Sequence, residues 1–328
     1  MVPTTQAAAL ERLADTPLPR RRAATRRMLV IVNPYATTMS VRLRHLVVSA
    51  LRGRFAVEAV DTRAPGHATE LCRNAALDGY DVVVAFGGDG TVNEAANGLV
   101  GSHTALTCLP GGAANVYCRM LGIPTDVVAA TEHLLGLNTR WRPRAVDLAR
   151  VNDRWFTFSA GAGLDASVVA RVDAHPRLKA RLGPWYYAQA AIAVFLERYV
   201  ADPPRVVAEI DGTRVEGVSV FVQNAQAYTY FRRRPVALSE GTGLTTGDLS
   251  AAVLTRANPL DVPTLAARLL SRVRVDRHRR VRAFDGLAGL RVRSTDARAV
   301  PLQVDGDFVG EDGEAVFSVL PAGLRVVA

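Results

Sequence analysis

The residues best suited to chemistry in this sequence are Gly87-Gly88-Asp89-Gly90-Thr91, which directly follow an apolar run at residues 81–86. Glycines at the carboxyl end of a parallel strand let backbone N–H groups approach phosphate oxygens, because no Cβ intervenes and positive φ is accessible. A helix predicted to begin near Thr91 would add the favourable dipole of its amino terminus. The pattern predicts a phosphate site, and its alternative is a tight strand–helix turn capped by Asp89 or Thr91.

Two further polar turns follow other apolar runs. Residues 110–115 (PGGAAN) form a second glycine-rich turn before a helical pattern, and Asn33-Pro34 ends the first apolar run. Because the carboxyl ends of parallel strands meet at one edge of a sheet, we expect the three turns to lie together. Two phosphate-type turns with a polar Asn turn indicate a nucleotide rather than a lone anion. The GxGxxG pattern is absent after the first run, which argues against an ordinary NAD-dependent dehydrogenase.

Four apolar runs, alternating with helical patterns, predict the elements that position these turns. The runs occupy residues 28–33, 55–62, 81–86 and 104–110. Strands that alternate with helices at this spacing are typical of a doubly wound parallel sheet. We therefore predict an α/β nucleotide-binding domain over residues 28–145.

The pattern changes on either side of this domain. Beyond it, short β-like stretches separated by turn residues predict an antiparallel, β-sandwich-like domain over residues 146–328, whose last residues could return to the first domain. Residues 1–27 lack a sustained apolar period and carry six arginines, so they are predicted to form a flexible basic arm. The predicted fold class is α/β followed by β.

Composition excludes two large enzyme classes. The chain has 40 Lys and Arg against 31 Asp and Glu, and Lys179 is its single lysine. Neither the Walker A loop nor the protein-kinase motifs can be built around it, because each needs a phosphate-binding Lys at a fixed position. Three cysteines without metal-ligand spacing indicate a reduced, cytoplasmic setting. We see neither an apolar run of membrane-spanning length nor the pattern of a signal peptide.

Six segments together resemble the catalytic domain of the diacylglycerol kinase and sphingosine kinase family of lipid kinases, with the bacterial branch the closer match. In the first half they are GGDGTVNEAANGL, the Asn33-Pro34 turn and LPGGAANVYCRMLGIP. In the second half they are FSAGAGLDASVV (158–169), PVALSEGTGLTTGDLSAAVL (235–254) and LQVDGD (302–307). The resemblance covers residues 28–328 and implies a two-domain kinase that uses ATP with Mg²⁺.

The resemblance also implies which residues contact the nucleotide. It places the turn up to Thr37 and the end of the second strand at Thr62 beside ATP. It gives Asp89 a catalytic role, either through Mg²⁺ or by organising its loop. The implied nucleotide-binding residues are Asn33, Pro34, Thr37, Thr62, Gly87, Gly88, Asp89, Gly90, Thr91, Asn93, Glu94, Gly112, Ala113 and Asn115.

The segment Val304-Asp305-Gly306-Asp307 lies where this family carries its general base. The resemblance implies that Asp305 deprotonates the lipid hydroxyl and that Asp307, in place of the usual Glu, supports it. Phosphoryl transfer needs positioning, charge neutralisation and one carboxylate that accepts the hydroxyl proton, which suits this role. The alternative is a plain hairpin turn, because Asp-Gly between apolar residues is a strong hairpin signal.

Several residues depart from the family pattern. Ala113 stands where Thr is usual and Val116 where Asp is usual, and both changes remove polar groups from the nucleotide site. Thr246 and Ser250 stand at two positions that are acidic in the bacterial branch, where a structural Mg²⁺ is bound. Asp248 is the one acidic residue between them and the candidate metal ligand that this segment retains. Mg²⁺ prefers carboxylate oxygens, so this second metal site is in doubt, whereas Mg²⁺ that accompanies ATP is unaffected.

The stretch Arg268–Arg282 holds seven arginines against one aspartate, with an apolar stripe in its first half. Such a basic amphipathic helix can dock on an anionic membrane. The alternative is a helix that packs its leucines on the core and leaves its arginines in water. We do not expect nucleic acid as a partner, because no aromatic residues interleave with the arginines.

We therefore interpret the chain as an ATP-dependent kinase of diacylglycerol or a related lipid alcohol. It would be cytoplasmic, with peripheral binding to the inner face of the plasma membrane, and a homodimer is left open. One alternative is an NAD kinase-like enzyme, since GGDGT is shared with that class. Another is a family member that binds lipid or nucleotide without turnover.

Overall fold

The computed structural model divides the chain into two compact units. The first comprises Met1–Val146 together with Ala322–Ala328, and the second comprises Asp147–Pro321. The residues that the structure describes are 4–15, 25–174, 193–194, 205–231, 234–239, 241–256, 258–261, 264–265, 267–268, 275–296 and 298–328.

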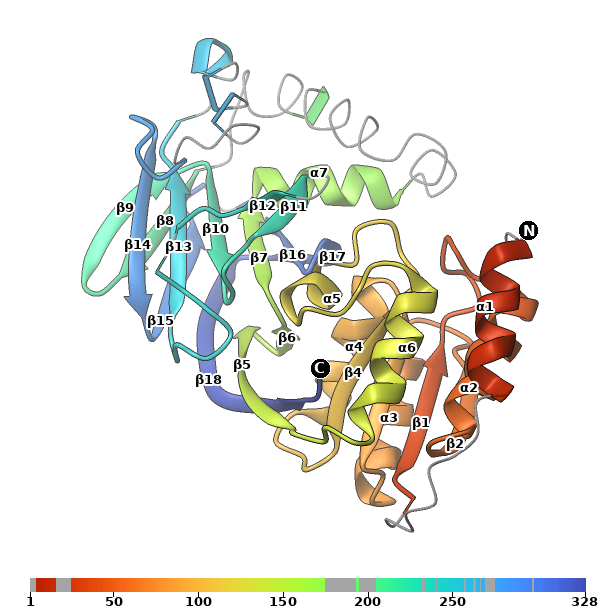
Figure 1. The fold of residues 1–328 in the computed structure, drawn as a ribbon. Helices are drawn as coiled ribbons and strands as arrows, with labels where there is room; N and C mark the ends of the chain where they lie inside the picture. Colours follow the sequence, from red (N-terminus) through yellow and green to blue (C-terminus); the bar gives the residue numbers. More distant parts are fainter. Residues whose placement is uncertain are drawn as a thin grey trace. The chain divides into compact units, whose positions relative to one another are not determined.

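A parallel sheet with strand order β2-β1-β3-β4 forms the centre of the first unit (Figure 1). All its neighbouring strands pair in parallel. Every residue of β3 and β4 is buried, because a sheet covered on both faces needs continuous apolar strands. The strands are β1 (Arg27–Val32), β2 (Ala56–Asp61), β3 (Val82–Gly87) and β4 (Ala105–Pro110).

Helices α1, α2 and α6 contact one another, and α3 and α4 form a second group, as expected for helices on both faces of a doubly wound sheet. Local chemistry fixes where they begin. Ser40 Oγ accepts the N–H of Leu43 at the start of α2, and Asp126 accepts the N–H groups of Val128 and Ala129 at the start of α6. The helices after β1 are α2 (Val41–Arg52), α3 (His67–Leu77), α4 (Asp89–Leu99), α5 (Val116–Met120) and α6 (Val127–Leu137).

The amino terminus differs from the predicted flexible arm. Residues Thr4–Asp15 form helix α1, and this helix packs against α2 and α6. Ala7 and Leu10 on its inner face are buried, and Gln6 donates a hydrogen bond to Asp126. The sequence pattern did not predict this helix. Among its described side chains only Ala7 and Leu10 are buried, which is too few to give a sustained apolar period.

The second unit is built mainly from antiparallel strands. One sheet has the order β14-β13-β10-β7-β16-β17, and β8 pairs with both β9 and β15. Small and branched side chains from these strands form its core. Helix α7 (Leu164–Asp173) follows β7 directly. The strands are β5 (Arg144–Val151), β6 (Arg154–Phe156), β7 (Ser159–Gly163), β8 (Val206–Ile210), β9 (Thr213–Gly217), β10 (Ser219–Gln223), β11 (Thr229–Phe231), β12 (Arg234–Val236), β13 (Leu249–Leu254), β14 (Val281–Leu287), β15 (Gly289–Ser294), β16 (Val300–Val304), β17 (Asp307–Asp312) and β18 (Glu314–Val326).

This architecture confirms the predicted fold class, a parallel α/β unit followed by an antiparallel β unit. The chain returns to the first unit at its carboxyl end, where Val326 pairs in parallel with Leu106 of β4. Among the described residues, we find no helix with the length and apolar character needed to cross a bilayer.

Packing of α1 predicts a measurable contribution to stability. Because the Leu10 side chain is fully buried (0% exposed), we expect Leu10→Ala to lower the free energy of unfolding by about 2–4 kcal/mol in urea denaturation. Leu77→Ala, at an 85% exposed position, is the matched control and should change it by less than about 0.5 kcal/mol. Equal stability of Leu10→Ala and wild type would show instead that residues 4–15 are a detached arm.

Candidate functional site

The two glycine-rich turns of the first unit pack backbone against backbone. The N–H of Gly111 donates to the carbonyl of Gly87 at 2.8 Å. A Cβ added to Gly111 would lie 2.9 Å from the Cα of Gly87, and one added to Gly112 would lie 2.8 Å from the Cα of Gly88. None of these four glycines has positive φ. The expected use of left-handed backbone is therefore absent here, and close approach of the two turns is what requires glycine at positions 111 and 112.

Asp89 joins the two turns through its carboxylate. Its Oδ2 accepts the N–H of Val116 and its Oδ1 accepts the N–H of Tyr117, each at 3.0 Å. These N–H groups belong to the first turn of α5. Of the two roles predicted for Asp89, these contacts favour organisation of the loop. Val116 contributes its backbone N–H to these contacts, so its side-chain type does not affect the hydrogen bond.

The side chain of Asn115 closes the second turn on itself. Its Oδ1 accepts the N–H of Gly112 at 2.9 Å, and its Nδ2 donates to the carbonyl of Gly112 at 2.6 Å. Asn115 has a positive φ of 47°, a conformation that Asn tolerates better than most residues. Ala113 lies exposed in the same turn, so the missing Thr side chain leaves no buried gap.

The turn after β1 joins the same cluster. The N–H of Asn33 donates to the carbonyl of Phe86 at 3.0 Å, and its Nδ2 donates to Thr91 Oγ1 at 3.3 Å. Thr38 donates both its N–H and its hydroxyl to the carbonyl of Gly111. The three turns therefore meet at the carboxyl edge of the parallel sheet, as the sequence predicts.

A cavity of about 240 Å³ opens beside these turns. Four of the predicted nucleotide-binding residues line it, namely Asn33, Thr62, Thr91 and Glu94. The predicted residue Asn93 is instead buried within α4, where its backbone and side-chain oxygens accept hydrogen bonds from Asn97.

The same cavity has further lining residues. Tyr35 lies within the turn up to Thr37 that the resemblance implies beside ATP, whereas Arg63, Ala64, Pro65 and Ala68 belong to no motif named from the sequence. The available signal was their position, because each follows a strand whose carboxyl end reaches the site.

Glu94 fixes one wall of this cavity. Its Oε1 accepts the N–H of Gly66 at 2.9 Å and its Oε2 accepts the N–H of Ala68 at 3.1 Å. Gly66 is the N-cap of α3 and has no side chain of its own to satisfy these groups. Glu94 therefore caps α3, and its negative charge occupies a helix terminus that could otherwise bind a phosphate.

Asp305 lies in the second unit, in the two-residue turn between β16 and β17. Asp305 and Gly306 have positive φ values of 50° and 86°, so the hairpin expected of Asp-Gly is present. The Asp305 carboxylate is only 4% exposed. It accepts hydrogen bonds from the N–H groups of Thr157, Phe158 and Ser159 and from the Thr157 hydroxyl, at 2.7–3.1 Å. These four donors fill its lone-pair positions and tie the turn to the segment that leads into β7.

A second polar cluster adjoins this hairpin and was missed by sequence reasoning. Gln303 accepts the N–H of Gly306 through Oε1 at 3.0 Å and donates to Asp165 Oδ2 at 2.7 Å. The Tyr228 hydroxyl also donates to Asp165. A Cβ on Gly161 would lie 2.7 Å from Asp165 Oδ2, so this glycine makes room for the cluster. Burial raises the pKa of Asp165 and holds the pKa of Tyr228 well above its ordinary value.

The residues at the doubtful metal site do not fit a carboxylate-bound Mg²⁺. Thr246 Oγ1 donates to Asp248 Oδ1 at 2.6 Å, and Ser250 Oγ donates to Asp285 Oδ1 at 2.6 Å. Hydroxyl hydrogen bonds thus fill both positions that are acidic in the bacterial branch. Within the described ranges, no group of three His, Cys, Asp or Glu side chains could hold a metal ion.

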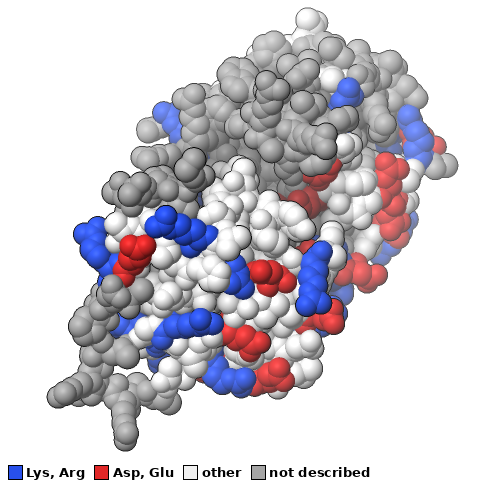
Figure 2. Space-filling view, turned by 90° about the vertical axis from the view of Figure 1, so that its right-hand side faces the viewer, with Lys and Arg blue, Asp and Glu red and all other residues white. Residues whose placement is uncertain are grey.

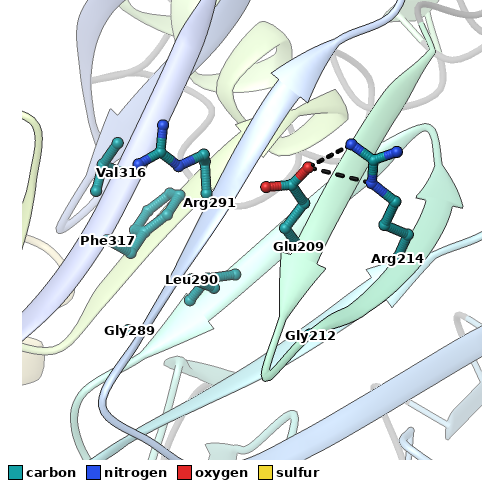
Figure 3. Close-up of a pocket in the computed structure, with 8 residues that line it drawn as sticks. All are labelled: Glu209, Gly212, Arg214, Gly289, Leu290, Arg291, Val316 and Phe317. Carbon is teal, nitrogen blue, oxygen red and sulfur yellow. Dashed lines mark hydrogen bonds and ion pairs between the residues drawn. The ribbon is translucent and has the colours of Figure 1, made fainter.

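A larger cavity, of about 570 Å³, lies in the second unit and contains none of the predicted site residues (Figure 3). Its charged groups are already paired. Arg214 donates twice to Glu209, and Arg291 pairs with Glu314 at 2.7 Å. Because its charges compensate one another, this cavity is a weaker candidate for a phosphate site than the glycine turns.

The predicted basic stretch Arg268–Arg282 lies partly outside the described residues. Of its arginines, Arg279 and Arg280 both pair with the buried carboxylate of Asp261. On the described part of the face shown in Figure 2, basic (blue) and acidic (red) side chains are interspersed and do not form a separate basic surface.

The glycine turns and the adjoining cavity thus lie in the first unit, and the antiparallel β unit is separate from them. Residues 27–151 match the family profile described as the diacylglycerol kinase catalytic domain. This match confirms the resemblance predicted from the sequence.

Two of the curated relatives are named diacylglycerol kinase. The chain is 33% identical over 159 residues to a diacylglycerol kinase of Bacillus subtilis (strain 168), a match that covers 48% of this chain and 50% of the relative. It is 30% identical over 147 residues to one of Staphylococcus haemolyticus (strain JCSC1435), with coverage of 44% and 43%. The matched segment thus spans about half the length of these relatives.

Solved structures show the fold over nearly the whole chain. A diacylglycerol kinase from Bacillus anthracis str. Sterne superposes with a TM-score of 0.72 at 22% identity, covering 93% of this chain and 98% of that one. At this identity the likeness establishes the fold, including the β unit that the family profile does not reach.

Contact between the glycine turns predicts a strong effect of one methyl group. Because a Cβ at position 112 would lie 2.8 Å from the Gly88 backbone, we expect Gly112→Ala to separate the turns. The variant should lose about 1–3 kcal/mol of stability in urea denaturation. Gly313→Ala is the control, since nothing lies within 4 Å of a Cβ there and its φ is ordinary. A Gly112→Ala protein as stable as Gly313→Ala would contradict the proposed backbone contact.

The Asp165 cluster predicts a pH-dependent stability difference. Because burial raises the pKa of Asp165 above its ordinary value of 3.8, the folded protein binds this proton more tightly than the unfolded chain does. Wild type should therefore lose stability relative to Asp165→Asn as pH rises from 4 towards 7. Urea unfolding at several pH values measures the difference, with exposed Asp153→Asn as control. A wild-type-to-variant difference that stays constant with pH would show that burial does not perturb Asp165.

Proposed function

We propose that this protein is an ATP-dependent lipid kinase that phosphorylates the hydroxyl of diacylglycerol or a related lipid alcohol. The observation that carries the proposal is the pair of glycine turns joined by Asp89 within a domain of the diacylglycerol kinase catalytic family. Such turns offer backbone N–H groups to phosphate oxygens. Mg²⁺ that accompanies ATP would neutralise charge on the phosphates.

The proposed nucleotide site divides into two parts. The cavity beside Thr62 would take the nucleoside end, because part of its wall is apolar and the Glu94 carboxylate would repel phosphate there. The triphosphate would then lie over the turns at Gly88 and Gly112, near the amino termini of α4 and α5. The predicted contacts of Pro34, Thr37, Gly90 and Ala113 belong to this proposal.

Asp305 is proposed as the general base, supported by Asp307 at the start of β17. The lipid oxygen attacks the γ-phosphorus, the bond to the bridging β–γ oxygen breaks, ADP leaves, and the hydroxyl proton passes to the carboxylate. Three of the four donors to Asp305 are backbone groups, whereas the fourth is the Thr157 hydroxyl. Rotation of that hydroxyl would free the lone pair that accepts the proton.

Peripheral binding to an anionic membrane through Arg268–Arg282 remains part of this proposal, because a lipid kinase must reach a substrate in a bilayer. The pairing of Arg279 and Arg280 with Asp261 leaves fewer arginines of this stretch for such binding.

Transfer of labelled phosphate from ATP with Mg²⁺ to a panel of lipid alcohols in mixed micelles tests the proposal, with NAD as a parallel acceptor. We expect label on a lipid alcohol. Asp89→Asn should lose both ATP binding and transfer, because one oxygen that holds the second turn becomes a donor. Asp305→Asn should bind ATP normally and lose transfer by about 100-fold or more, because it removes the proton acceptor.

The outcomes separate the alternatives. Label on NAD alone would assign the protein to the NAD kinase-like class. No label on any acceptor, from folded protein that binds ATP, would show a family member without turnover. Transfer at the wild-type rate by Asp305→Asn would show that Asp305 anchors the hairpin and is not the base.

A further inference from the structure

Two large side chains project from neighbouring turns at the cavity of the first unit. Tyr35 follows β1 and Arg63 follows β2, and these strands are adjacent, with Val32 paired to Asp61. Both side chains line the cavity, and both are exposed, Tyr35 to 86%. They therefore flank the same opening from two different turns.

The backbones that carry these side chains are held in place. The N–H of Tyr35 donates to Asn33 Oδ1 at 3.0 Å, and the N–H of Arg63 donates to His67 Nδ1 at 3.1 Å. Thr62, next to Arg63, donates its N–H to the carbonyl of Val32 at 2.8 Å. In the part of the chain that the structure describes, neither the Tyr35 ring nor the Arg63 guanidinium has a protein partner of its own.

The chemistry of this opening suits a flat aromatic ring better than a phosphate. Ala64, Pro65 and Ala68 form an apolar part of its wall, and the N–H groups of Gly66 and Ala68 at the start of α3 already donate to Glu94. Its volume of about 240 Å³ lies below the roughly 300–1,000 Å³ of pockets that enclose drug-sized ligands. The cavity therefore has room for one end of a nucleotide and not for the whole molecule. A tyrosine ring and a guanidinium plane both stack on nucleobases.

We propose that Tyr35 and Arg63 form a clamp that stacks on the two faces of the nucleobase of the bound nucleotide. This inference rests on the proposed nucleotide site and adds to it the residues that recognise the base. The clamp contributes affinity for the nucleoside end and none for the phosphates, which bind at the glycine turns.

Calorimetric titration of the full chain with ATP and with inorganic tripolyphosphate, both with Mg²⁺, tests the clamp. We expect Tyr35→Ala and Arg63→Ala each to bind ATP about tenfold more weakly, with the affinity for tripolyphosphate unchanged. Tyr35→Phe keeps the ring and should bind ATP as wild type does. Val41→Ala, at a 74% exposed position that does not line the cavity, is the matched control.

Each other outcome overturns the clamp in a recognisable way. Wild-type affinity for ATP in both alanine variants would refute it while leaving the nucleotide site intact. An equal loss of ATP and tripolyphosphate affinity would mean that these residues act on the phosphates or on the fold. Absence of ATP binding by wild type itself would refute the proposed nucleotide site and the clamp together.

Discussion

The arrangement of the candidate site in the first unit depends on the backbone contact between its two glycine-rich turns. Gly87 and Gly88 touch Gly111 and Gly112 so closely that a single Cβ would force them apart. This contact brings the ends of β3 and β4 and the starts of α4 and α5 to one place. Asp89 then fixes α5 through two backbone N–H groups, which couples the two turns where the phosphates are proposed to bind.

In the second unit, too, one turn is held in place by contacts with a distant segment of the chain. There, a carboxylate and not a glycine contact holds the key turn, because Asp305 accepts three backbone N–H groups from Thr157 to Ser159. Asn224 continues the network by donating to the carbonyls of Thr157 and Asp147. Buried polar groups satisfied in this way specify one arrangement of a loop, since any displacement leaves a donor unpaired. The hairpin that carries the proposed base is thus fixed from within its own unit.

Much of this could be predicted from the sequence because the relevant signals are local. The apolar runs before Asn33, Gly87 and Pro110 identify parallel strands, and parallel strands must present their turns at one edge. What Gly88, Gly111 and Gly112 do could not be predicted, because their closest contacts are with residues more than twenty positions away. Leu10 and α1 were missed for a related reason, since the helix is anchored by few side chains against distant helices.

Residues that act without a motif were also beyond sequence reasoning. Asp165, Tyr228 and Gln303 meet only after β7, β10 and β16 pair, and nothing in their spacing indicates it. Tyr35 and Arg63 line one cavity because β1 and β2 are neighbours. In each case the pairing of strands, and not a local sequence pattern, brings the side chains together.

The central claim is that the joined glycine turns bind the phosphates of ATP. Hydrogen–deuterium exchange of backbone amides, with and without ATP and Mg²⁺, tests it most directly. The account predicts slower exchange at residues 87–91 and 111–117 when ATP is present. ATP-induced protection confined to the cavity beside Glu209 and Arg214, or absent from both glycine turns, would contradict it.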